Sequence, residues 1–293
     1  MKFAITGKTK LISLLGSPVS HSRSPSMQNG VFEALGLDYV YVAFDVGLDN
    51  VEAAIDGLRA MNFRGSNVTM PLKKVVCQYL DKLTPAAEMA GAVNVIINDD
   101  GVLTGHITDG EGYMMSLVDA GVEYIGKKMI IVGSGGASTA VAIQAAMDGV
   151  RSISIFNHKD AFYSNGERTV EGLRQQIGCE AHMFDLADMN LLRKEMMSSD
   201  IFINATPIGM EETLDQSVIP DASYFHKNLI VTDLIYVPVE TKLLKIAKAA
   251  GNKTVNGLGM QLFQGVSAFK MWTGHDMPID VAREILFGKS VTK

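Results

Sequence analysis

The chain has 293 residues, 47% hydrophobic and 20% charged, and its 26 Lys+Arg against 32 Asp+Glu give a formal net charge of −6. This is the composition of a globular protein, with a length that suggests two domains of roughly 100–200 residues each. Mild acidity without a long basic run argues against a nucleic-acid partner, and the longest apolar runs are far shorter than the roughly 18 residues of a membrane helix. The class that remains is an enzyme acting on a small molecule.

Cysteine usage indicates a reducing environment. The two cysteines, Cys77 and Cys179, cannot build a disulfide framework, and their separation fits no zinc-ligand spacing. The short apolar segment Leu11–Leu15 is also too short for the core of a signal peptide. We therefore expect a cytoplasmic protein without a metal.

Short apolar runs alternate with helical patterns along the first part of the chain, which is typical of an α/β fold. Asn98–Gly101 has the composition of a tight hairpin turn, and the first domain is expected to cover residues 1–110. The expected strands are Leu11–Leu15, Tyr39–Val46, Asn67–Met70 and Ala92–Ile97, and the expected helices are Met27–Leu35, Val51–Met61 and Val75–Leu83.

A second α/β pattern over residues 111–254 predicts a Rossmann-type domain with a doubly wound parallel sheet. It is followed by one further helix. The expected strands are Met129–Val132, Ile153–Phe156, His182–Phe184, Ile201–Asn204 and Leu229–Asp233, and the expected helices are Glu111–Asp119, Thr139–Met147, Leu191–Met197, Thr241–Ala250 and Gly259–Trp272.

A glycine-rich turn, Gly133–Thr139, lies between a buried strand and a helix. In a dinucleotide-binding turn Gly133 would permit the tight turn and Gly135 would let the backbone approach the pyrophosphate. The helix N-terminus would add free N–H groups and a positive dipole end. Ser138 takes the third position, where glycine is usual. The alternative is a glycine turn that only reverses the chain.

The end of the next strand bears on the choice of cofactor. An acid at this point binds the ribose of NAD, whereas an arginine accommodates the 2′-phosphate of NADP. The sequence offers Asn157, Lys159 and Asp160 and no arginine, which favours NAD and leaves NADP as the second choice. The alternative is a solvated loop in which Asp160 faces away.

Polar residues follow several expected strands of the first domain, where α/β proteins often bind ligands. Each has a structural alternative: Ser24 before Pro25 could cap a helix, Asn67 and Thr69 could form a turn, and Asp109 could be an N-cap. The segments concerned are Gly16–Pro25, Asn67–Lys73, Gly91–Asn94 and Gly105–Gly110.

Together with motifs further on, these segments resemble the shikimate dehydrogenase family over essentially the whole chain. The glycine-rich turn, Asp160 and the segment Trp272–Gly274 are most similar to its quinate/shikimate dehydrogenase branch, which accepts NAD. The motifs, in chain order, are His21–Pro25, Asn67–Lys73, Ala92–Asn94, Thr108–Gly110, Gly133–Ser138, Asn204–Thr206 and Gly257–Met260.

The resemblance implies hydride transfer between a nicotinamide cofactor and shikimate, giving 3-dehydroshikimate, with quinate as a second candidate substrate. Lys73 and Asp109 match the family's catalytic acid–base pair. A proton must leave the hydroxyl as the hydride leaves its carbon, and the sequence leaves open which of the two residues holds it. Lys74 lies outside the motif.

The resemblance also assigns binding residues. Ser22 and Ser24, with Thr69 nearby, match residues that hold the substrate carboxylate, and Asn67, Asn94 and Gln264 match residues that reach the ring hydroxyls. Because Gln264 lies on the helix near the C-terminus, we expect residues 255–293 to complete the first domain. Tyr41 is a weaker candidate for the pocket. The cofactor-binding candidates are Gly133, Ser134, Gly135, Gly136, Ala137, Ser138, Asn157, Lys159, Asp160, Thr206, Gly257 and Met260.

Two departures from the family pattern keep other functions open. Ile107 and Val95 stand where the family usually has polar side chains, so the pocket could be less polar. The alternatives are a dinucleotide-binding sensor without turnover and a dehydrogenase for a related ring such as an amino-substituted shikimate. The sequence leaves monomer and homodimer open.

Overall fold

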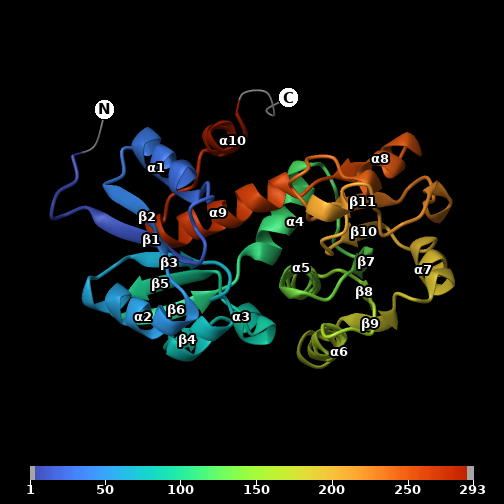
Figure 1. The fold of residues 1–293 in the computed structure, drawn as a ribbon, viewed down its shortest axis with the longest axis horizontal. Helices are drawn as coiled ribbons and strands as arrows, with labels where there is room; N and C mark the ends of the chain where they lie inside the picture. Colours follow the sequence, from blue (N-terminus) through green and yellow to red (C-terminus); the bar gives the residue numbers. More distant parts are fainter. Residues whose placement is uncertain (1–3, 289–293) are drawn as a thin grey trace. The chain divides into compact units, whose positions relative to one another are not determined.

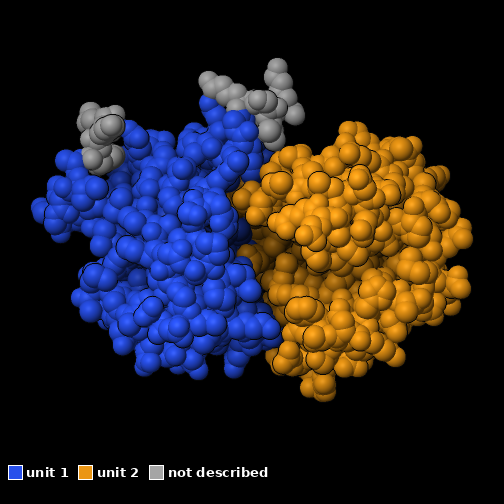
Figure 2. Space-filling view, viewed as in Figure 1, with its two compact units in different colours: residues 1–108, 264–293 blue, residues 109–263 orange. Residues whose placement is uncertain are grey.

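The computed structural model describes residues 4–288 and confirms the α/β class (Figure 1). The chain forms two compact units, coloured separately in Figure 2: unit 1 comprises residues 1–108 and 264–293, and unit 2 residues 109–263. The division falls inside helix α9 (Leu258–Thr273), whereas the motif analysis put the return to the first domain at residue 255. No helix within residues 4–288 is long and apolar enough to cross a membrane.

Unit 1 is built on a six-stranded mixed sheet with the order β2-β1-β3-β5-β6-β4. Strands β1, β2 and β3 are parallel, and β5 and β6 form the expected hairpin, with positive φ at Asp100 (53°) and Gly101 (92°), as a tight hairpin turn requires. The strands are β1 (Lys10–Gly16), β2 (Tyr39–Asp45), β3 (Gly65–Val68), β4 (Lys82–Leu83), β5 (Val95–Asp99) and β6 (Val102–His106).

Two helices of this unit agree with the expectation, one expected helix does not form, and two others were not expected. The expected helix Val75–Leu83 is wrong: a 3-10 turn, Val75–Tyr79, is followed by the extended residue Leu80 and by β4. The chain is extended there because β4 pairs with β6, and the Asp81 carboxylate, bound by Arg59 and by the Leu103 N–H, holds the start of this pairing. The helices are α1 (Ser24–Leu35), α2 (Val51–Ala60), α3 (Pro85–Ala90) and α10 (Ile279–Phe287), of which the last two were not expected.

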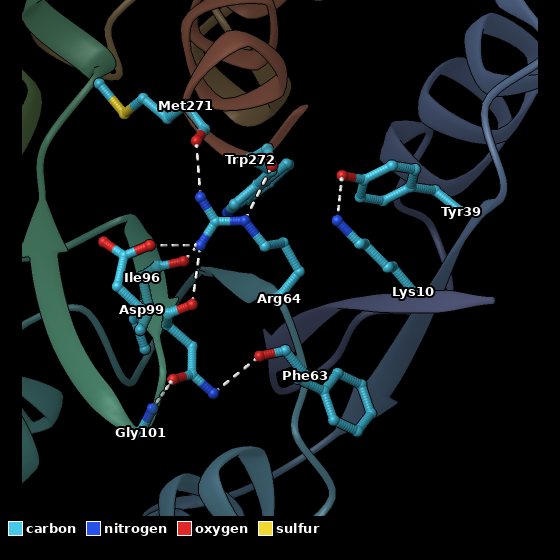
Figure 3. A network of polar contacts seen from close by, with 10 residues as sticks. Lys10, Tyr39, Phe63, Arg64, Ile96, Asp99, Gly101, Met271 and Trp272 are labelled. Carbon is cyan, nitrogen blue, oxygen red and sulfur yellow. Dashed lines mark hydrogen bonds and ion pairs between the residues drawn. The ribbon is translucent and has the colours of Figure 1, made fainter. Parts of the chain in front are cut away.

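Arg64 joins the C-terminal end of α9 to the sheet of unit 1 (Figure 3). Its guanidinium donates to the carbonyls of Trp272 (2.9 Å), Met271 (3.3 Å) and Asn98 (2.7 Å). The Trp272 indole N–H in turn donates to the Ile96 carbonyl at 3.0 Å. These bonds place the second half of α9 against β3 and β5, beside the residues of the substrate motifs.

Unit 2 contains a six-stranded, fully parallel sheet with the order β12-β11-β10-β7-β8-β9, as expected for a Rossmann-type domain. Its central strands are buried on both faces, because helices cover the sheet on both sides. The strands are β7 (Lys128–Val132), β8 (Ser152–Asn157), β9 (Glu180–Asp185), β10 (Ile201–Asn204), β11 (Ile230–Asp233) and β12 (Thr254–Val255).

The direction of winding reverses between β7 and β10, and the loops after these two strands therefore leave the sheet at a switch point where α/β folds bind ligands. The expected helices form, and α6 was missed. The helices are α4 (Asp109–Asp119), α5 (Gly136–Met147), α6 (Tyr163–Gly172), which continues as a π-helical segment Leu173–Ile177, α7 (Met189–Met196) and α8 (Lys242–Ala249).

Candidate active site

Polar side chains of unit 1 form one continuous hydrogen-bonded line. Ser24 binds the Tyr41 hydroxyl, which donates to Asn67 Oδ1 at 2.8 Å. Asn67 Nδ2 donates to the Asn94 carbonyl at 3.0 Å, and the Asn94 side chain binds both the N–H (2.8 Å) and the hydroxyl (3.1 Å) of Thr108. Each of the four substrate motifs of this unit contributes a residue to the line, although the motifs are far apart in the sequence.

Burial fixes the chemical state of this line. Tyr41 is 2% exposed, and burial raises its pKa far above the ordinary value, so its hydroxyl stays protonated and acts as a donor. Asn67 and Asn94 are buried as well. A buried amide needs partners, because an unsatisfied polar group is costly. The line therefore orients both amides before any ligand binds.

The structure removes the structural alternative for Ser24 and for Asn67, but not the turn at Thr69. Helix α1 begins at Ser24 without a side-chain cap, and the Ser24 N–H instead binds the Ser22 hydroxyl at 3.3 Å. Asn67 lies in strand β3, not in a turn. Thr69 follows that strand, half-buried, with its N–H bonded to the Leu15 carbonyl. Its own carbonyl accepts from the Leu72 N–H at 2.9 Å, so a turn does begin at Thr69.

Lys73 and Lys74 differ in their surroundings. Lys73 is half-buried, and its carbonyl accepts from the Val93 N–H at 2.8 Å, so its backbone lies beside the segment that leads through Asn94 into β5. Lys74 is exposed. The Gln264 carbonyl accepts from Thr108 at 3.0 Å, which attaches α9 to the same line.

Asp109 is the first residue of α4 and of unit 2, and it is half-buried. The following Gly110 packs so closely on α5 that a Cβ there would overlap the Ala140 carbonyl oxygen. This contact holds the start of α4 against the helix of the glycine-rich turn. Since Lys73 belongs to unit 1, its pairing with Asp109 remains a prediction.

The glycine-rich turn has the geometry that a pyrophosphate needs. Gly133 has φ of +106°, and a Cβ there would lie 2.7 Å from the Ala205 carbonyl oxygen, so both conformation and space require glycine. A Cβ at Gly135 or Gly136 would meet no atom within 4 Å. Ser138 takes the third position because its buried hydroxyl donates to the Gly133 carbonyl at 2.7 Å. The open space before the first turn of α5 fits the diphosphate of a dinucleotide.

At the end of β8 the Asp160 carboxylate is held by its own loop. Its Oδ1 accepts from Asn157 Nδ2 (2.9 Å) and from the Phe162 N–H (2.8 Å). Lys159 lies 3.9 Å from the Asp185 carboxylate, which offsets part of its positive charge.

A pocket of about 580 Å³ lies in unit 2 next to this turn. It is lined by Ala137 from α5, by residues 205–207, 210, 211 and 214, and by residues 234–238. Thr206 and Ala137 were expected here, whereas Tyr236 and the other residues of the second loop were missed. The only feature of the sequence that could have identified these residues is their position after a strand of the parallel sheet.

Gly257 supports the loop 234–238, because a Cβ at Gly257 would overlap the Leu234 carbonyl oxygen. Met260 follows in the half of α9 that belongs to unit 2.

The departures Ile107 and Val95 are buried, at 9% and 0% exposure. Val95 lies in the interior of unit 1 as part of β5, where an apolar side chain leaves no polar group unpaired.

Among residues 4–288 no group of three or more His, Cys, Asp or Glu side chains could hold a metal. Cys77 and Cys179 are free thiols.

Comparisons with known proteins agree with this geometry. Residues 14–96 match the family model described as the shikimate dehydrogenase substrate binding domain, and residues 257–287 match the shikimate 5′-dehydrogenase C-terminal domain. Shikimate dehydrogenase (NADP(+)) of Listeria monocytogenes serotype 4b (strain F2365) is 54% identical over 283 residues, which are 97% of each chain. Quinate/shikimate dehydrogenase of Escherichia coli (strain SMS-3-5 / SECEC) is 41% identical over 96% of this chain and 98% of the relative.

Among solved structures, shikimate 5-dehydrogenase from Listeria monocytogenes in complex with shikimate and NAD is similar to this chain with a TM-score of 0.95 and 54% identity. The similarity covers 98% of this chain and 99% of that one. The resemblance inferred from the motifs is thereby confirmed over nearly the full length, and the chain belongs to the shikimate dehydrogenase family.

Proposed function

We propose that this protein is an NAD(P)-dependent dehydrogenase that interconverts shikimate and 3-dehydroshikimate, with quinate as a second substrate. The observation that carries the proposal is the hydrogen-bonded line from the half-buried Ser24 through the buried Tyr41, Asn67 and Asn94 to Thr108. A row of neutral donors and acceptors suits a polyhydroxylated ring, whose oxygens are costly to bury without partners.

Within this proposal, hydroxyl groups hold the charged end of the substrate. Ser22, Ser24 and Thr69 would donate to its carboxylate. Asn67, Asn94 and Gln264 would bind the ring hydroxyls, and the fixed orientation of the two asparagines would set which face of the ring is presented.

Lys73 and Asp109 are the proposed acid–base pair. In the oxidative direction one of them would take the proton of the reacting hydroxyl as the C–H bond breaks, and in the reverse direction it would return the proton to the forming hydroxyl. The bound nicotinamide would accept or supply the hydride. Gly135, Gly136 and the N-terminus of α5 would hold its diphosphate.

We propose NAD as the better cofactor, with NADP also used. Asp160 would repel a 2′-phosphate, and its loop holds the carboxylate in place through Asn157 and Phe162. Lys159 is already near Asp185, so it offsets this repulsion only in part. A cytoplasmic location, where both cysteines stay reduced, belongs to the same proposal.

The test is a panel of shikimate and quinate, each with NAD and with NADP, followed by the absorbance of the reduced nicotinamide. We expect turnover with shikimate. If neither substrate reduces either cofactor while calorimetry still detects dinucleotide binding, the protein is a sensor and the dehydrogenase proposal is wrong.

A further inference from the structure

One carboxylate of unit 2 is buried without a cationic partner. Asp233 ends β11 and is 1% exposed. Its Oδ1 accepts from Asn204 Nδ2 (3.1 Å) and from the Ile235 N–H (3.0 Å), and its Oδ2 accepts from the Thr241 hydroxyl (2.7 Å). Within the described part of the chain no lysine, arginine or histidine binds it. Three neutral donors therefore carry the whole of its stabilisation.

Two of these donors connect Asp233 to the two loops that line the pocket of unit 2. Ile235 belongs to the loop 234–238 directly. Asn204 leads to the other loop, because its Oδ1 accepts from the N–H (3.1 Å) and the hydroxyl (2.7 Å) of Thr206. The Thr206 hydroxyl then accepts from the Ile208 N–H at 3.2 Å. A single side chain thus joins two pocket walls that are about 30 residues apart in the sequence.

The charge on this side chain is costly. Burial raises the pKa of Asp233 to about 6, so at neutral pH the group is an anion in a site that favours a neutral one. What the charge adds is stronger hydrogen bonds to the loops, since hydrogen bonds to an ionised acceptor are roughly twice as strong as neutral ones. Such bonds fix the loops more firmly than an amide could.

We propose that Asp233 is a positioning residue for the dinucleotide, whose carboxylate holds the loops 205–208 and 234–238 in the conformation that receives the nicotinamide half of the cofactor. This inference rests on the proposed function for the identity of the ligand. It goes further in assigning a role to a residue that would not touch the ligand. Pre-forming the pocket lowers the cost of ordering these loops on binding.

The test is Asp233→Asn, which keeps the shape and one acceptor oxygen but removes the charge. Dissociation constants for NAD and NADH are measured by calorimetry without substrate, below the onset of melting, and the dissociation constant for shikimate is measured separately. We expect the dinucleotide constants to rise at least tenfold and the shikimate constant to change less than twofold, with a melting temperature at pH 7.5 no lower than that of the unmodified protein. Thr241→Val, which removes one donor, should weaken the dinucleotide in the same direction by a smaller factor.

Asp148→Asn is the matched control. That carboxylate also accepts from two neutral donors in unit 2, Tyr124 (3.0 Å) and Gln144 (2.8 Å), but it does not line this pocket. We expect unchanged dinucleotide binding. If folded Asp233→Asn binds NAD and NADH as the unmodified protein does, or if Asp148→Asn loses as much affinity, the positioning role is wrong. Because binding is measured without turnover, this result is independent of whether the protein oxidises shikimate.

Discussion

The two glycines of the dinucleotide turn should respond to the same substitution in opposite ways. Gly135 has φ of −77°, which alanine adopts freely, and its Cβ would meet no atom within 4 Å. Gly135→Ala should therefore leave the free energy of unfolding unchanged or raise it by about 0.4–1 kcal/mol, because alanine restricts the unfolded chain. Its methyl group would, however, occupy the space left for the diphosphate.

The expected loss of affinity for the dinucleotide follows from the hydrogen bonds between its phosphates and the backbone amides. A hydrogen bond to a charged group contributes about 1.5–3 kcal/mol, so displacing one phosphate–amide bond should weaken dinucleotide binding by about 10- to 100-fold. Gly133→Ala differs, because φ of +106° and a contact of 2.7 Å to the Ala205 carbonyl oxygen are both incompatible with alanine. Backbone strain of about 1–3 kcal/mol and a similar cost of overpacking should together lower the free energy of unfolding by about 2–6 kcal/mol.

Urea unfolding followed by circular dichroism gives the stabilities, and calorimetric titration with NAD gives the affinities. The reasoning is refuted if Gly135→Ala binds NAD as tightly as the unmodified protein, since the open space would then not be where the diphosphate lies. Equal losses of stability in the two variants would also contradict it.

Four further predictions concern the proposed site and its charges. Lys73→Ala should lower kcat by about 10²–10⁴-fold in steady-state kinetics, whereas the neighbouring Lys74→Ala should change it little; equal losses would mean that the motif is misplaced. NAD should give a several-fold higher kcat/KM than NADP, and Asp160→Ala should narrow that ratio; a higher value with NADP in the unmodified protein contradicts this. Ile107→Asn should lower KM for shikimate by an amount equivalent to about 1–3 kcal/mol with less effect on kcat, and an unchanged KM would place Ile107 outside the pocket. Burial raises the pKa of Asp233 from 3.8 to about 6 on folding, so its contribution to stability is present at low pH and is lost as pH rises through about 6. The difference in unfolding free energy between the unmodified protein and Asp233→Asn should therefore shift by about 2.4 kcal/mol between pH 4 and 7.5, and a constant difference would show that Asp233 does not titrate there.

Local signals in the sequence were sufficient for most of the fold. The hairpin at Asp100–Gly101 and the turn at Gly133 depend on backbone conformations that few residues other than glycine, asparagine and aspartate adopt, so composition alone identified them. Buried strands such as β7 and β10 are short apolar runs in any context. The helix α6 was missed because its sequence, Tyr163–Gly172, is mostly polar and contains few apolar residues. The segment after Tyr79 became a strand because its backbone pairs with β6, which is about 20 residues away in the sequence.

The residues of the candidate site likewise fall into those that the sequence identified and those that only the structure identified. Motif resemblance was enough to name Ser24, Asn67 and Asn94, since each lies in a short segment with its own pattern. Tyr41 and Asp233 had no such pattern, and a buried strand tyrosine or aspartate looks the same in sequence whether it connects a site or merely fills a core. Only the tertiary structure shows which donors surround them, because hydrogen-bond partners on neighbouring strands are set by the order of the sheet and not by distance along the chain.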